Sequence, residues 1–178
     1  MEWYNEPPLW HEYGARIDVT TAPGTDFWRT THYGFIHDNG HFYFQHVSGD
    51  FTASVVVRGA YAARYDQAGL MVRVNETTWL KCGIEFVDDV QYASAVVTRE
   101  YSDWSVAPLA GNPAALRLRI QRRGGAVDIE YACEGMAYTR LRLAHLNTGE
   151  TVQVGPMAAS PDGPGFQVAF EDFTVDKP

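Results

Sequence analysis

The chain has 178 residues, with 14 lysine and arginine residues against 22 aspartate and glutamate residues, which gives a formal net charge of -8. Hydrophobic residues make up 46% and charged residues 20%, a balance typical of a folded protein that excludes a disordered chain. The negative charge argues against a nucleic-acid partner, because binding phosphates requires a concentrated positive surface. This length predicts a single domain over residues 1–178.

The N-terminus carries no basic stretch followed by an apolar run, so we expect no signal peptide. No segment approaches the roughly 18 consecutive apolar residues of a membrane-spanning helix. The two cysteines, Cys82 and Cys133, lie in strand-like runs without C-x-x-C spacing, and we expect reduced thiols. Together these features predict a cytoplasmic protein with no membrane partner.

Strand patterns dominate the chain after an N-terminal segment rich in Pro, Trp and Tyr, residues 1–23, which we expect to pack along the body of the domain. Apolar and polar residues then alternate, with turn signals about every ten residues, which is typical of an all-β sandwich or barrel. The pattern therefore predicts an all-β protein.

The first predicted hairpin joins Thr31–Asp38 to His41–Val47 through an Asn39-Gly40 turn. Asn-Gly is a strong hairpin signal because both residues tolerate positive φ. A two-residue loop pairs Asp38 with His41. The face that we assign to the core carries four aromatic side chains: Tyr33, Phe35, Phe42 and Phe44.

The second predicted hairpin joins Gln67–Val74 to Thr78–Val87 through a three-residue loop. One face is wholly apolar, with Leu70 opposite Cys82 and Val72 opposite Leu80. The other face mixes polar, charged and aromatic groups around two glycines. Its predicted pairs are Gln67 with Glu85, Gly69 with Gly83, Met71 with Lys81, and Arg73 with Trp79.

A third unit is predicted from three strands at residues 116–122, 127–133 and 137–143. One side is apolar: Leu118, Ile120, Val127, Ile129, Tyr131, Leu141 and Leu143. Across the other side the register pairs Arg119 with Glu130, Glu130 with Arg140, and Asp128 with Arg142. Opposite charges in cross-strand pairs indicate a solvated outer face.

The last predicted strands run over residues 151–157 and 165–175, with a bulge at Glu171-Asp172. Before that bulge Phe166, Val168 and Phe170 alternate inward. A C-terminal strand of this strength is expected to pair inside a sheet and close the domain.

Five runs of residues stand out: Asp26–Arg29, Asp38–Phe42, Tyr65–Met71, Trp79–Glu85 and Ser102–Ser105. Together they resemble the family catalogued as domain of unknown function 1349, over about residues 5–175. The resemblance implies a two-sheet antiparallel jelly-roll sandwich of the concanavalin A-like superfamily, the architecture of many lectins and glucanases, but it implies no known reaction.

The polar face of the second hairpin is the candidate site. Sugars present C–H patches that stack on aromatic faces and hydroxyls that need directional partners. We therefore predict a non-catalytic module that binds a carbohydrate or another small polar ligand on the concave sheet face, with neither a metal nor a cofactor. The predicted ligand-binding residues are Gln67, Arg73, Trp79, Lys81 and Glu85, with His32, Asp103 and Trp104 at the rim.

Three alternatives stay open. Trp79 and Arg73 can form a cation–π pair that simply covers the sheet, and Lys81 and Glu85 a surface salt bridge. A glycoside hydrolase-like enzyme would need Glu85 with Asp66 or Asp103 as an acid/base pair. Exposed aromatic residues would also suit a protein partner or a homodimer.

Overall fold

The structure is a computed structural model that describes residues 1–146 and 149–178. Its strands form two seven-stranded antiparallel sheets and a small hairpin. Sheet A has the order β1 (Glu2–Tyr4), β6 (His41–Ser48), β15 (Thr151–Ala159), β8 (Gln67–Asn75), β9 (Thr78–Val87), β10 (Val90–Arg99) and β11 (Tyr101–Pro108). Sheet B has the order β14 (Thr139–His145), β13 (Ala126–Cys133), β12 (Leu116–Arg123), β7 (Phe51–Gly59), β16 (Gln167–Asp176), β3 (Arg16–Thr20) and β2 (Leu9–Tyr13).

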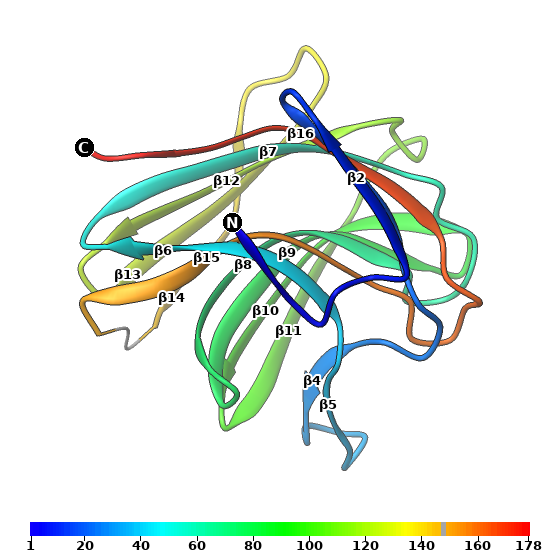
Figure 1. Ribbon diagram of the computed structural model, residues 1–178, viewed down its shortest axis with the longest axis horizontal. Coiled ribbons are helices and arrows are strands. Elements are labelled where there is room, and N and C mark those ends of the chain that lie inside the picture. The colour runs from blue at the N-terminus through cyan, green and yellow to red at the C-terminus, as the bar shows by residue number, and fades with distance from the viewer. Residues whose placement is uncertain (147–148) are drawn as a thin grey trace.

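The two sheets pack face to face, and the hairpin of β4 (Phe27–Arg29) and β5 (Ile36–Asp38) lies on the outer side of sheet A (Figure 1). This arrangement confirms the predicted antiparallel jelly-roll sandwich. The N-terminal segment does more than pack along the body, because β1 extends sheet A and β2 and β3 extend sheet B. In the described ranges there is no helix long and apolar enough to span a membrane.

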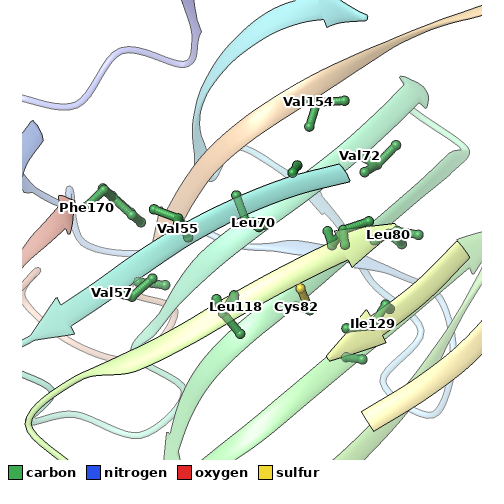
Figure 2. Close-up of a cluster of buried hydrophobic side chains, with 14 of the residues drawn as sticks. Val55, Val57, Leu70, Val72, Leu80, Cys82, Leu118, Ile129, Val154 and Phe170 are labelled. Carbon is green, nitrogen blue, oxygen red and sulfur yellow. The ribbon is translucent and has the colours of Figure 1, made fainter. Parts of the chain in front are cut away.

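Strand alternation builds the core between the sheets, because every second side chain of each strand points inward. Figure 2 shows how these side chains from the two sheets meet. The labelled ones are Val55, Val57, Leu118, Ile129 and Phe170 of sheet B, and Leu70, Val72, Leu80, Cys82 and Val154 of sheet A.

The second hairpin has the predicted register, with Gln67 opposite Glu85 and Leu70 opposite Cys82. The facing glycines are required where the strands approach closely. A Cβ on Gly83 would lie 2.0 Å from the carbonyl oxygen of Ala68. The prediction succeeds here because a short loop and an unbroken alternation fix both the partner strand and its register.

The first predicted hairpin is wrong. Residues 39 and 40 form no two-residue hairpin turn: neither has a positive φ, and the backbone N–H groups of both donate to the carbonyl oxygen of Asp26, at 3.1 and 2.9 Å. β5 therefore pairs with β4, whereas β6 pairs with β1 and β15. An Asn-Gly pair in the sequence therefore does not guarantee a hairpin, and it does not determine which strand becomes the neighbour.

Because the strands pair differently from the prediction, the aromatic residues assigned to the core also lie elsewhere. Tyr33 and Phe35 lie in the loop between β4 and β5, where they are 44% and 40% exposed. Phe42 and Phe44 are buried, but on the outer face of sheet A. Tyr43 takes the position that points into the core between the sheets.

The third unit is largely as predicted, including the cross-strand pairs of Glu130 with Arg119 and with Arg140. A bulge between Ile129 and Glu130 then shifts the register, so the predicted pair of Asp128 with Arg142 does not form. Asp128 instead pairs with Arg140 at 2.7 Å. Leu143, assigned to the apolar side, is 60% exposed for the same reason.

The C-terminal prediction is confirmed. Phe166, Val168 and Phe170 are buried, and β16 lies inside sheet B between β7 and β3. The register shifts between Glu171 and Thr174, and Asp172 has a φ of 54°. The predicted bulge is therefore present.

Candidate ligand-binding site on the outer face of sheet A

The outer face of sheet A is divided into a closed half and an open half. In the closed half, side chains of β6, β8, β9, β10 and β15 pack under β4 and form a second hydrophobic cluster. Trp79 lies in this cluster with no exposed surface, its ring 6.1 Å from that of Phe27. The cluster consists of Phe27, Trp28, Phe42, Phe44, Met71, Trp79, Val96 and Met157.

A buried ion pair fixes the hairpin over this half. Arg73 donates from Nη1 and Nη2 to the two carboxylate oxygens of Asp38, both at 2.8 Å. The hydroxyl of Tyr4 donates to the same carboxylate at 2.7 Å, and the guanidinium of Arg73 lies 4.5 Å from the Tyr4 ring centroid. Arg73 is therefore already fully engaged by β1 and β5.

These contacts differ from the sequence prediction for two residues. Trp79 was expected to offer its ring to a ligand and Arg73 its guanidinium, but the β4–β5 hairpin covers both. Alternation correctly placed them on the outer face. The cover results from the pairing of β5 with β4, whereas the sequence pattern predicted that residues 31–38 pair with residues 41–47.

The open half contains a cavity of about 320 Å³. Gln67, Lys81 and Glu85, three of the predicted residues, line it together with Trp104. Other residues that the sequence did not point to also line it, among them Asp26, Tyr33, Phe35 and Tyr65. The available signal for the last three was an excess of aromatic residues in segments that belong to loops.

A hydrogen-bond network holds the floor of the cavity. Lys81 Nζ donates to Asp26 Oδ1 at 3.1 Å and to Gln67 Oε1 at 2.5 Å. Gln67 Nε2 donates to Asp26 Oδ1 at 3.1 Å. Lys81 and Gln67 are buried, so this ion pair is shielded from water and fixes the Asp26 carboxylate in place.

Glu85 is the most unusual polar group of the cavity. Only 8% of the residue is exposed, and its Oε2 accepts hydrogen bonds from Ser94 Oγ at 2.7 Å and Trp104 Nε1 at 2.8 Å. Burial raises the pKa of the Glu85 carboxyl, against the opposing effects of Lys81, Ser94 and Trp104.

Each of the two carboxylates keeps one oxygen free of protein hydrogen bonds. All contacts of Asp26 go to Oδ1 and both contacts of Glu85 go to Oε2. Asp26 Oδ2 and Glu85 Oε1 have no hydrogen-bond partner among residues 1–146 and 149–178. The cavity therefore offers two acceptors to a ligand that carries donors.

Exposed aromatic rings form the rim. Trp104 is 39% exposed, and the stacked rings of Tyr33 and Phe35 lie 5.3 Å apart. The hydroxyls of Tyr33 and Tyr65 lie 3.3 Å apart and link the β4–β5 loop to the segment before β8. This rim presents apolar ring faces beside the buried polar floor.

A second hollow of about 570 Å³ adjoins the cavity. The two share Trp28, Tyr33 and Trp104, and the second hollow is also lined by the predicted rim residues His32 and Asp103. The structure thus brings Gln67, Lys81, Glu85 and Trp104 into the cavity and places His32 and Asp103 beyond its rim.

Neither predicted carboxylate pair occurs in the cavity. Asp66 is buried, and its oxygens accept from the backbone N–H groups of residues 62 and 63 and from Ser160 Oγ. Asp103 lies opposite Val97, a residue of the inter-sheet core, so it emerges on the other face of sheet A from Glu85. The carboxylate that shares the cavity with Glu85 is Asp26.

The outer face of sheet B and the acidic and sulfur-containing side chains offer weaker sites. A hollow of about 560 Å³ lies on the outer face of sheet B, but its Arg16 and Arg58 already pair with Asp18 and Glu171. Within the described part of the chain, no group of three or more His, Cys, Asp or Glu side chains is arranged to hold a metal ion.

The two packed seven-stranded sheets define a protein of the concanavalin A-like class, and solved structures agree on this fold. The chain is similar to the GH43 protein BlXynB from Bacillus licheniformis, with a TM-score of 0.73, 17% identity, and coverage of 96% of this chain and 35% of that one. It is also similar to the alginate lyase from Klebsiella pneumoniae, with a TM-score of 0.66, 10% identity, and coverage of 98% and 86%. At these identities the likeness concerns the fold alone.

The chain belongs to the family described as "Protein of unknown function (DUF1349)", whose model matches residues 3–178. It is 38% identical over 176 residues to "Regulation of enolase protein 1" of Saccharomyces cerevisiae, covering 99% of this chain and 89% of that protein. It also matches the crystal structure of a functionally unknown protein from Saccharomyces cerevisiae, with a TM-score of 0.95, 38% identity, and coverage of 99% and 96%.

Proposed function

We propose that this protein is a binding module for a neutral saccharide or a similar small polyol, held in the cavity on the outer face of sheet A. One observation carries the proposal: the same cavity combines exposed aromatic rings with two carboxylate oxygens that have no hydrogen-bond partner in the described ranges. Sugar rings present C–H patches to aromatic faces and hydroxyl donors to acceptors.

The charges of the lining favour a neutral ligand. Asp26, Glu85 and Asp162 are acidic, whereas Lys81 and Arg64 are basic. Lys81 is already paired with Asp26 at 3.1 Å, so its charge is largely compensated. An anionic ligand would therefore meet the free oxygens of two carboxyl groups without a free buried cation to balance them.

Glycoside hydrolysis is a second candidate, because Glu85 and Asp26 share the cavity and Glu85 has a raised pKa, as a general acid requires. Against it, Asp26 Oδ1 accepts three hydrogen bonds, one of them from Lys81, so this oxygen is already engaged by the protein and is not free to attack a substrate. We therefore expect binding without turnover. Release of reducing ends that is lost in Glu85→Gln would favour the enzyme instead.

The proposal is tested by a glycan array followed by calorimetric titration of the best neutral ligand. Phe35→Ala removes an exposed ring from the rim, and we expect affinity to fall about tenfold, or ~1.4 kcal/mol. Tyr101→Ala is the matched control, since Tyr101 is an exposed aromatic residue of β11 outside the cavity. Failure of every neutral glycan to bind, or equal losses in both variants, would contradict the proposal.

A further inference from the structure

The cavity is bounded on the side of the closed half. Phe27 and Trp28 of β4 cover Trp79 and Met71, and the Arg73–Asp38 pair fixes the hairpin there. A saccharide held on Glu85 has no space to continue along sheet A toward β6. The outer face therefore offers a pocket and not a groove that runs the length of the sheet.

A second boundary lies between two loops. The hydroxyl contact of Tyr33 with Tyr65, at 3.3 Å, joins the β4–β5 loop to the segment before β8. The backbone at Thr30 and His32 in the β4–β5 loop has positive φ, 61° and 64°, which non-glycine residues rarely adopt. The loop is thus held in a specific conformation that brings Tyr33 to the rim.

A third direction leads over Trp104. Trp28, Tyr33 and Trp104 line both the cavity and the second hollow of about 570 Å³. Beyond them lie His32 and Arg142, which line the second hollow and not the cavity. A ligand that leaves the cavity by this route meets an exposed indole first and polar side chains after it.

Resting on the proposed function, we infer that the site binds the end of a saccharide chain: the terminal ring enters the cavity and the next ring lies in the second hollow beyond Trp104. The hydroxyls of the terminal ring donate to Glu85 Oε1 and Asp26 Oδ2. The volume of about 320 Å³ lies at the lower end of the roughly 300–1,000 Å³ typical of small-molecule sites, which suits a chain end and not a polymer segment.

The test is calorimetric titration with glucose, mannose and xylose and with their neutral oligosaccharides of two and four rings. We expect about a tenfold gain in affinity from one ring to two in the series that binds, and no further gain from two rings to four. Polymers of the same sugar should bind in proportion to their number of chain ends. Affinity that keeps rising to four rings, or polymer binding along the whole chain, would overturn the inference.

A substitution in the second hollow distinguishes its contribution to binding from that of the cavity. Arg142→Met should abolish the two-ring gain and leave the affinity for one ring unchanged, because Arg142 lines the second hollow and not the cavity. Arg140→Met on the same strand is the control, because Arg140 pairs with Asp128 and does not line the hollow. If Arg142→Met kept the gain in affinity from one ring to two, the inference about the chain end would be wrong and the proposed function would stand. If no series bound at all, the proposed function would be wrong as well.

Discussion

At the scale of single residues, the fold changes the acid–base chemistry of Glu85. Its carboxyl is buried at the floor of the cavity, and burial raises its pKa above the ordinary glutamate value. The folded protein therefore binds this proton more tightly than the unfolded chain does. The stabilisation that results is complete below the unfolded pKa and is lost as pH rises through the folded pKa.

We therefore expect the difference in melting temperature between Glu85→Gln and the wild type to depend on pH. The amide oxygen of the substituted side chain can accept from Ser94 and Trp104, and no buried charge remains. We expect the melting temperature of the variant relative to the wild type to increase between pH 5 and pH 8, measured by thermal unfolding. Glu134→Gln, at an exposed position, should show a constant difference. A constant difference in Glu85→Gln as well would show that the carboxyl titrates normally.

At the level of elements, the β4–β5 hairpin determines which part of sheet A is accessible. It is held by the buried pair of Asp38 with Arg73, whose side chains are 22% and 5% exposed. In Asp38→Asn the guanidinium would stay buried without a charged partner, which costs about 3 kcal/mol of unfolding free energy. Denaturant unfolding measures this loss.

The matched control for the hairpin is Asp128→Asn on sheet B. Asp128 also pairs with an arginine, but Arg140 is 60% exposed, and such pairs contribute about 0–1 kcal/mol. If Asp38→Asn and Asp128→Asn lost equally little unfolding free energy, the pair of Asp38 with Arg73 would not be what holds the hairpin over the sheet.

The same elements show what sequence patterns can and cannot predict. The register of Gln67–Arg73 against Trp79–Glu85 agrees with the prediction, since a short loop makes the two strands neighbours and alternation sets the faces. At the loop the prediction fails, because a bulge pairs Asn75 with Thr78. β6 pairs with β15, which lies about a hundred residues away, and β5 with β4. Local turn chemistry contains no information on such distant partners, so Tyr33 and Phe35 were wrongly assigned to the core.

For the molecule as a whole, the sandwich followed from alternation, but the cavity depends on three segments meeting over one sheet. Gln67, Lys81 and Glu85 were assigned to the same outer face because each faces away from Leu70 and Cys82. Asp26 comes from the loop before β4 and Tyr65 from the segment before β8. Their contribution is a tertiary contact that alternation within one hairpin cannot reveal.

The packing of the two sheets also makes one cysteine a reporter of global unfolding. Cys82 lies in the centre of the core (Figure 2), and burial raises the pKa of its thiol to about 12. Cys133, at the end of β13, is only half-buried. Because the thiolate is the reactive form, we expect an aromatic disulfide reagent at pH 8 to label one thiol per chain rapidly.

The second thiol should react only at the rate at which the sandwich opens, and both should react at once in denaturant. Cys133→Ser should remove the rapid phase and leave the slow one unchanged, which assigns each phase to its residue. Rapid labelling of Cys82 in the native state would mean that the sheets separate locally around Leu70 and Leu80. In that case the outer face of sheet A, and the cavity built on it, would not be held rigidly by the core beneath.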